Sequence, residues 1–349
     1  MRVLLTGHQG YLGTVLAPVL TSAGHRVTGL DSGLFADCVL GPAPPDPPGL
    51  AVDVRDVTAD QLAGFDAVVH LAALSNDPLG ALAPELTHEI NHRASTRLAR
   101  LAKEAGVGRF LYASTCAVYG SQGGDELVGE EAPLKPVTPY AVSKVRVEDD
   151  LWQLADAAFS PTALRNATAF GFSPRLRADI VLNNLVGHAL LTGVVRVLSD
   201  GTPWRPLVHA ADIAAAVLAV LEAPRSAVHG QAFNVGTEAN NRTVAQLAAS
   251  VAAEVPGSEV VITGEAGPDP RSYRVDFSRL RTAVPAFAAR WSIPAGAAEL
   301  AAAYRAHGLT GHDFDTRFTR LARLARRREL GAVGPDLRPS SGLLERESV

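Results

Sequence analysis

The stretch Val3-Leu4-Leu5-Thr6-Gly7-His8-Gln9-Gly10-Tyr11-Leu12-Gly13 decides the fold of this chain. Its first residues form a short apolar run that is typical of a buried strand, and Thr14 to Ala23 has the pattern of an amphipathic helix. The glycines between them permit a tight turn, and the helix N-terminus offers N–H groups and a positive dipole end to a diphosphate. This order predicts a dinucleotide-binding unit, with an ordinary glycine-rich turn as the alternative.

The next strand-like run, Arg26–Leu30, ends at an acidic residue, Asp31. A carboxylate about 20 positions past the glycines can accept hydrogen bonds from an adenosine ribose. Ser32 and Gly33 follow, without an adjacent arginine that would bind a 2′-phosphate, so we expect NAD rather than NADP. An incidental carboxylate at a strand end is the alternative.

Further apolar runs alternate with helical segments along the first half of the chain. Strands are predicted at 50–56, 67–73 and 109–113, with a surface loop at 41–49 and a long helix from Pro84 to Ala105. This alternation predicts an α/β fold built on a doubly wound parallel sheet of the Rossmann type. We expect His70 to be a packed core histidine. The residues expected to contact NAD are Gly7, Gly10, Tyr11, Leu12, Gly13, Asp31, Ser32, Asp53, Val54, Leu71, Ala72, Ala73 and Ser114, together with Tyr140 and Lys144.

Composition excludes several classes of protein. The 349 residues are 47% hydrophobic and 19% charged, which is typical of a globular protein of about two domains. A net charge of -4 gives no reason to expect nucleic acid or a membrane surface as partner. Two cysteines, Cys38 and Cys116, cannot form a disulfide framework, so we expect a cytoplasmic protein. We expect no metal.

Thr115, Tyr140 and Lys144 are the candidate catalytic residues. Tyr140 and Lys144 are four residues apart, which places both side chains on one face of a helix. The ammonium can lower the pKa of the phenol and make it a base near neutral pH. The hydroxyl of Thr115 would complete a set that removes a proton from an alcohol. The spacing alone is a weak signal and depends on the motifs around it.

These motifs together resemble those of the extended short-chain dehydrogenases/reductases. The matching segments are TGHQGYLG at 6–13, HLAA at 70–73, STCAVYG at 114–120 and PYAVSK at 139–144. Within that superfamily, roughly residues 1–300 look like the NAD-dependent nucleotide-sugar epimerases and dehydratases. The resemblance implies a smaller C-terminal α/β lobe for substrate at 166–310, with 207–236 returning to the NAD-binding domain at 1–165.

The same resemblance implies a nucleotide-diphosphate sugar as substrate. Asn184 corresponds to the family's diphosphate-contacting asparagine, and Arg205 to its phosphate-binding arginine; a buried structural amide and a surface arginine are the alternatives. Thr168 replaces a family asparagine, and Arg271 is a possible substitute for a missing arginine. The substrate residues expected are Ser75, Asn76, Asn91, Thr168, Asn184, Arg205, Arg271 and Tyr273.

Two departures from the family pattern narrow the reaction. Sugar 4,6-dehydratases carry Asp and Glu after the catalytic threonine, whereas Cys116 and Ala117 stand here. Alanine cannot transfer a proton, and Cys116 is expected to pack or to line the pocket. The resulting prediction is a 4-epimerase. A nucleotide-sugar 4-ketoreductase or dehydrogenase with exchangeable cofactor, and a non-catalytic dinucleotide-binding scaffold, remain as alternatives.

Beyond residue 310 the resemblance fades. The arginine-rich segment Phe314–Leu330 is predicted to form a solvated amphipathic helix, and residues 331–349 a disordered tail. By analogy we expect a homodimer, formed through the helices that begin near Pro84 and Pro139. The apolar face of the first helix is equally compatible with burial against the sheet.

Overall fold

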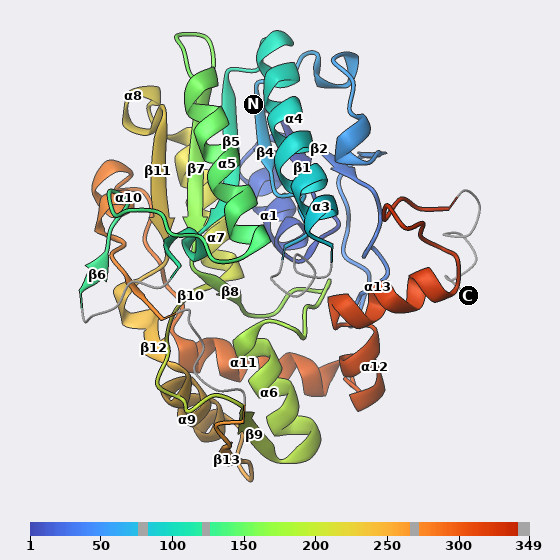
Figure 1. Cartoon of the computed structure of the whole chain (residues 1–349), viewed down its shortest axis with the longest axis vertical. Coiled ribbons are helices and arrows are strands. Elements are labelled where there is room, and N and C mark those ends of the chain that lie inside the picture. The colour runs from blue at the N-terminus through green and yellow to red at the C-terminus, as the bar shows by residue number, and fades with distance from the viewer. Residues whose placement is uncertain (76–82, 121–125, 266–271, 341–349) are drawn as a thin grey trace.

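A seven-stranded parallel sheet forms the centre of the larger lobe (Figure 1). The computed structural model describes residues 1–75, 83–120, 126–265 and 272–340. In spatial order the strands are β11 (Gln231–Val235), β7 (Ser160–Asn166), β5 (Arg109–Thr115), β4 (Ala67–His70), β1 (Arg2–Thr6), β2 (Arg26–Asp31) and β3 (Gly49–Ala51). Each neighbouring pair is parallel. The predicted fold class is confirmed.

Helices cover both faces of this sheet, as a doubly wound fold requires. Side chains of β1 alternate between the faces, with Val3 and Leu5 in one core cluster and Leu4 in the other. The first cluster includes α1 (Tyr11–Ser22) and α7 (Ala210–Glu222); the second includes α4 (Ala94–Glu104) and α5 (Pro139–Leu154). Because β1 from Val3 onward and β4 are buried on both sides, their sequences are mainly apolar, whereas the edge strand β3 is partly exposed.

Close backbone packing explains the glycine turn between β1 and α1. Gly7 has φ +75°, and a Cβ there would lie 2.8 Å from the backbone nitrogen of Ala72. A Cβ on Gly13 would lie 2.2 Å from the carbonyl oxygen of Gly7. The helix therefore approaches the strand more closely than any side chain would allow. It begins at Tyr11 rather than at Thr14, since Gly10 is its N-cap.

Two predicted elements differ from those observed. The strand predicted at 50–56 ends at Ala51, because the Asp53 carboxylate accepts a bond from the Arg55 amide and caps the short helix η1 (Val54–Asp56). The helix predicted from Pro84 to Ala105 consists of three segments: α3 (Pro84–Thr87), the π-helical η3 (His88–Arg93) and α4.

The smaller lobe lies beyond the carboxyl ends of the sheet strands, beneath the sheet in Figure 1. Its helices α6 (Val181–Thr192), α9 (Val244–Glu254) and α11 (Ile293–Ala306) share one apolar cluster. Its strands form one three-stranded sheet of β8 (Thr168–Phe170), β10 (Trp204–His209) and β12 (Asn241–Thr243), and two pairs: β9 (Val194–Val197) with β13 (Glu259–Ile262), and β6 (Leu127–Val128) with β14 (Arg274–Val275). Within 207–236, β11 pairs with β7 in the main sheet, and α7 contributes to the first core cluster.

The C-terminal segment differs most from its prediction. We call residues 311–340 the C-terminal strap; it contains α12 (Gly311–Thr316) and α13 (Arg320–Glu329). Several of its arginines contact the protein instead of solvent, while Arg326 and Arg328 are exposed. Arg327 and Arg323 form ion pairs with the carboxylate of Asp37, and Arg317 donates to the carbonyl oxygen of the same residue. One acidic side chain in the loop after β2 thus attracts an arginine-rich helix that the sequence alone suggests is exposed.

The tail prediction is also wrong for residues 331–340. Ala332, Val333 and Leu337 are buried, and a bridge joins Val333 to Pro339. Burial of these apolar side chains compensates the entropy of ordering the segment. Residues 341–349 lie outside the described residues. Within the described ranges, no helix has the length and apolar character needed to cross a membrane.

Candidate active site

A cavity of about 1020 Å³ lies between the two lobes, along the carboxyl ends of the sheet strands. This edge is where open α/β sheets bind their ligands. Of the residues predicted to bind cofactor or substrate or to act in catalysis, the cavity is lined by Gly7, Gly10, Tyr11, Leu12, Gly13, Asp31, Ser32, Asp53, Val54, Leu71, Ala72, Ala73, Ser75, Ser114, Thr115, Tyr140, Lys144, Thr168, Asn184, Arg205 and Tyr273. Folding therefore assembles one site from segments that are far apart in sequence.

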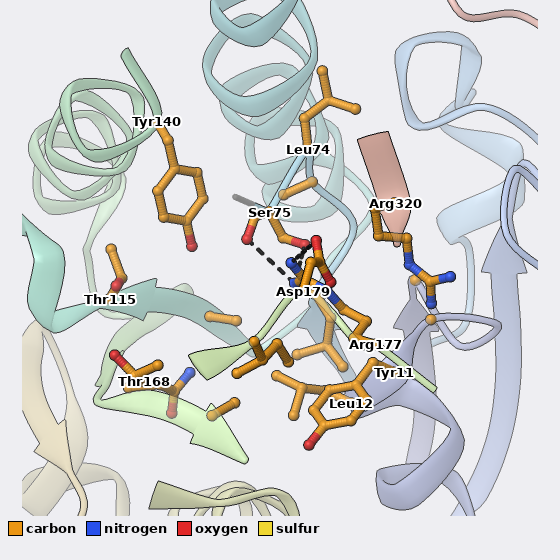
Figure 2. A pocket seen from close by; sticks show the side chains of 18 of the residues that line it. Tyr11, Leu12, Leu74, Ser75, Thr115, Tyr140, Thr168, Arg177, Asp179 and Arg320 are labelled. Atoms are coloured by element: carbon orange, nitrogen blue, oxygen red, sulfur yellow. Dashed lines mark hydrogen bonds and ion pairs between the residues drawn. The ribbon is translucent and has the colours of Figure 1, made fainter. Parts of the chain in front are cut away.

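Thr115, Tyr140 and Lys144 meet at one end of this cavity. Thr115 ends β5, and Tyr140 follows Pro139 in the first turn of α5, whose N-cap Thr138 accepts a bond from the amide of Ala141. Figure 2 shows the Tyr140 hydroxyl and the Thr115 side chain on the same side of the cavity. The Nζ of Lys144 lies 5.6 Å from the centroid of the Tyr140 ring. All three residues therefore line the same cavity.

Burial sets the charge of Lys144. Desolvation lowers the pKa of its ammonium to about 7, although the nearby Glu148 carboxylate raises it in part. Nζ donates to the carbonyl oxygen of Ala113 at 2.7 Å, which fixes the amine beneath the Tyr140 ring. A protonated Lys144 at this position stabilises a phenolate on Tyr140, while a neutral one does not.

A buried ion pair between Arg165 and Glu148 lies next to Lys144 on α5. Glu148, one helical turn after Lys144, is 1% exposed and accepts from Arg165 at 2.6 Å and from the hydroxyl of Ser114 at 2.5 Å. Arg165 also donates to the hydroxyl of Tyr119 at 3.1 Å. These bonds join α5 to the ends of β5 and β7. Arg165 itself does not line the cavity.

Cys116 belongs to this buried layer. Its thiol is 1% exposed and donates to the carbonyl oxygen of Arg165 at 3.1 Å. Burial raises the pKa of the Cys116 thiol well above its usual value, so the thiol stays neutral. The packing interpretation is confirmed. The following residue, Ala117, does line the cavity and presents only a methyl group there.

The other end of the cavity fits a dinucleotide. The carboxylate of Asp31 accepts from the amides of Gln9 and Gly33 at 3.0 and 2.9 Å, so it is held at the end of β2. Burial raises the pKa of Asp31, although these hydrogen bonds lower it in part. The Asp53 carboxylate is paired with Arg55 at 2.7 Å. Backbone of the glycine turn, a fixed carboxylate and small side chains after β4 are the groups that hold a diphosphate and a ribose.

The smaller lobe contributes the polar groups of the substrate side. Asn184 donates from its amide to the carbonyl oxygen of Ala178 at 3.1 Å, and Arg205 donates to that of Trp204 at 2.8 Å. Thr168 and Tyr273 line the same region. Two other predicted residues, Asn76 and Arg271, lie outside the described residues.

Two sequence predictions concern histidine and asparagine side chains that the structure places in the interior. Asn91 does not line the cavity. Its side-chain oxygen accepts from the Leu74 amide at 2.8 Å, and its side-chain nitrogen donates to the Leu74 carbonyl oxygen at 3.0 Å. It holds the segment that precedes Ser75 rather than a ligand. His70 is 1% exposed between Thr6 and Ser95, as expected, and burial lowers its pKa to about 3.

Several charged residues line the cavity without having been predicted from the sequence, among them Arg177, Asp179 and Arg320. Arg177 forms a double hydrogen bond to Asp179 and donates to the Ser75 hydroxyl at 3.0 Å (Figure 2). No sequence motif identifies Arg177 and Asp179. Through its bond to Ser75, Arg177 links the smaller lobe to the loop after β4. Arg320, at the start of α13, also lines the cavity. Because its helix was predicted to be exposed to solvent, the sequence does not predict that Arg320 lines the cavity, and only the tertiary structure shows this.

Comparison with known proteins agrees with this geometry. Residues 3–236 match the NAD dependent epimerase/dehydratase family. UDP-glucose 4-epimerase from Corynebacterium glutamicum is 30% identical over 253 residues, covering 68% of this chain and 75% of that protein. The corresponding enzyme from Mycolicibacterium smegmatis is 31% identical, with 70% and 79% covered.

Solved structures give the same result. The structure of MoeE5 in complex with UDP-glucuronic acid and NAD aligns with a TM-score of 0.75 and 29% identity, covering 88% of this chain and 99% of that one. An NDP-hexosamine 5,6-dehydratase, TunA, aligns with a TM-score of 0.78 at 24% identity, which shows the shared fold. The cofactor is NAD. This chain therefore belongs to the NAD dependent epimerase/dehydratase family.

Proposed function

We propose that this protein is an NAD-dependent nucleotide-sugar 4-epimerase. The observation that carries the proposal is the surface of the cavity beside Thr115. There Ala117 supplies a methyl group, and the thiol of Cys116 is turned away into the protein. Elimination of water from a sugar requires a further acid and base, whereas epimerisation at one hydroxyl-bearing carbon requires only the Thr115, Tyr140 and Lys144 set.

In this mechanism each residue has one task. Tyr140 as phenolate removes the proton of the sugar 4-hydroxyl, and Thr115 hydrogen-bonds the same oxygen. Lys144 keeps the phenolate ionised through its positive charge. NAD, held by the glycine turn and Asp31, would supply reversible hydride transfer at the sugar carbon. The 4-keto sugar turns within the cavity and is reduced on its other face, while Tyr140 gives the proton back.

The substrate is proposed to be a nucleoside diphosphate sugar. Asn184, Arg205, Thr168 and Tyr273 form a polar surface on the smaller lobe, next to the catalytic end of the cavity. MoeE5, the solved relative described above, holds UDP-glucose in one structure and UDP-glucuronic acid in another. Asn76 and Arg271 remain part of the proposed substrate set.

A direct test follows the sugar and the cofactor together. Freshly purified protein is incubated with a panel of nucleotide sugars, and the products are identified by NMR. We expect interconversion at C4 without net consumption of NAD, and a loss of about 10²- to 10⁴-fold in turnover for Tyr140→Phe. Stoichiometric consumption of added NAD(P)H would make the protein a ketoreductase. Loss of water from the sugar would contradict both reactions.

We also propose a homodimer, formed through α4 and α5. These two helices lie together on one face of the main sheet (Figure 1). Light scattering on the purified chain tests this directly, since a monomer mass of 36.5 kDa would contradict it.

A further inference from the structure

The C-terminal strap places a buried cation in the cavity that the proposed mechanism does not use. Arg320 is the first residue of α13, is 4% exposed and lines the cavity (Figure 2). Neither of its terminal nitrogens, Nη1 and Nη2, has a hydrogen-bond partner among the described residues. Burial of an unpaired charge is costly, so a guanidinium in this state indicates an anionic ligand.

The surroundings of Arg320 do not neutralise it. Its guanidinium carbon lies 4.5 Å from the centroid of the Phe35 ring, and the nearby Cys38 thiol stays neutral because burial raises the Cys38 pKa. The nearby carboxylate of Asp179 forms two hydrogen bonds with Arg177. None of these groups forms a hydrogen bond or an ion pair with the terminal nitrogens of Arg320.

The elements around Arg320 place it on the cofactor side. Leu34 and Phe35, which follow Asp31 after β2, line the cavity together with Leu337 of the same strap. Arg55, beside Asp53, donates to the carbonyl oxygen of Asp336 at 2.9 Å. The strap is thus attached at the adenosine end, whereas the proposed substrate groups come from the smaller lobe.

We propose that the guanidinium of Arg320 binds the diphosphate of NAD and that the C-terminal strap thereby retains the cofactor. Arginine suits this task because its planar fork can donate two hydrogen bonds to phosphate oxygens. A strap that slows release of the dinucleotide fits an enzyme that reuses the same NAD in each cycle. The inference rests on NAD as cofactor and not on the epimerase reaction.

Full-length variants test this proposal without an activity assay. Arg320→Met removes the charge, Arg320→Lys keeps it without the fork, and Arg326→Met is the matched control on the same helix, since Arg326 is 58% exposed. NAD content is measured on release by denaturation, and the Kd of NAD and of UDP by calorimetry after the NAD is removed. We expect Arg320→Met to weaken NAD binding about 10- to 100-fold, with UDP binding unchanged and Arg326→Met like the wild type. Arg320→Lys should retain more NAD affinity than Arg320→Met.

Thermal unfolding separates ligand binding from a structural role. Because the buried charge is unpaired, we expect the NAD-free Arg320→Met protein to melt at the wild-type temperature or above it, and NAD to raise its Tm less. Unchanged NAD affinity would overturn the proposal. So would weaker binding of UDP with unchanged binding of NAD, which would assign Arg320 to the substrate diphosphate. A lower Tm of the NAD-free variant would show that Arg320 stabilises the fold instead.

Discussion

Replacing Lys144 by methionine should raise the pKa of Tyr140 by up to about 2 units, with the full shift only where Lys144 is protonated, because burial lowers the Lys144 pKa to about 7. The Nζ of Lys144 lies 5.6 Å from the centroid of the Tyr140 ring. At that separation, with an effective dielectric constant of about 20, a unit charge stabilises a phenolate by about 3 kcal/mol. Because 1.36 kcal/mol corresponds to one pKa unit, this is about 2 units. Methionine has a similar length and no charge, so the change removes mainly this electrostatic effect.

Tyrosinate absorbance measures the shift directly. The chain has six tyrosines, and burial raises the pKa of Tyr11, Tyr112, Tyr119 and Tyr304. These four hydroxyls therefore stay protonated at mildly alkaline pH. Subtraction of the curve of a Tyr140→Phe protein isolates Tyr140.

A second lysine variant serves as the control for the Lys144 charge. Lys103→Met removes a charge that is paired with Asp156 on the surface, so this protein should titrate like the wild type. A Lys144→Met protein whose Tyr140 ionises at the wild-type pH would refute the electrostatic role. If turnover also fell by one factor at every pH, Lys144 would act through cofactor binding.

The same variant changes the pH dependence of stability. Burial lowers the pKa of Lys144 to about 7, so the unfolded chain binds more protons than the native chain between pH 7 and the ordinary lysine pKa near 10. The contribution of Lys144 to the free energy of unfolding therefore rises with pH across this range, and below pH 7 the buried ammonium destabilises the fold. Lys144→Met should lack this rise in urea unfolding, and an identical pH profile would contradict it.

Three further substitutions test the cofactor cradle and the buried layer. In Gly13→Ala, a Cβ 2.2 Å from the Gly7 carbonyl oxygen must displace the turn, so NAD binding should be lost while circular dichroism stays native; tight NAD binding would contradict this. Glu148→Gln leaves Arg165 buried without its carboxylate and should lower the free energy of unfolding in urea by about 3 kcal/mol or more; a loss below about 1 kcal/mol would show that the ion pair is not needed. Asp31→Asn replaces a carboxylate with an amide and should reduce the preference for NAD over NADP in calorimetry, whereas an unchanged ratio would exclude Asp31 from ribose recognition.

Local pattern determined most of the larger lobe. The order of strand, glycine turn and helix, and Asp31 at the end of β2, follow from properties that neighbouring residues share. Their period and their backbone conformation are local, so the sequence displays them directly. The prediction of a strand over 50–56 was wrong for a local reason as well, because the side chain of Asp53 caps the short helix η1 and ends the extended conformation.

Tertiary structure decided which charged and polar groups face the cavity. The sequence shows the spacing of Tyr140 and Lys144. It does not show that Glu148, on the same helix, bonds Arg165 and Ser114, because those two residues lie on strands that meet the helix only in the folded protein. Asn91 was predicted to contact the substrate, but its side-chain amide forms hydrogen bonds with the backbone of Leu74 instead.

The C-terminal strap shows this division most clearly. Its sequence predicted one amphipathic, arginine-rich helix over Phe314–Leu330 and nothing about the partner of that helix. Asp37 and Arg327 are separated by 290 positions, and only folding brings them within 2.8 Å. The sequence of this protein therefore determined its sheet, its glycine turn and its catalytic spacing, because these depend on neighbouring residues. The tertiary structure alone decided that the first residue of an arginine-rich helix, Arg320, lines the cavity, because the energy of a buried charge depends on groups that are distant in the chain.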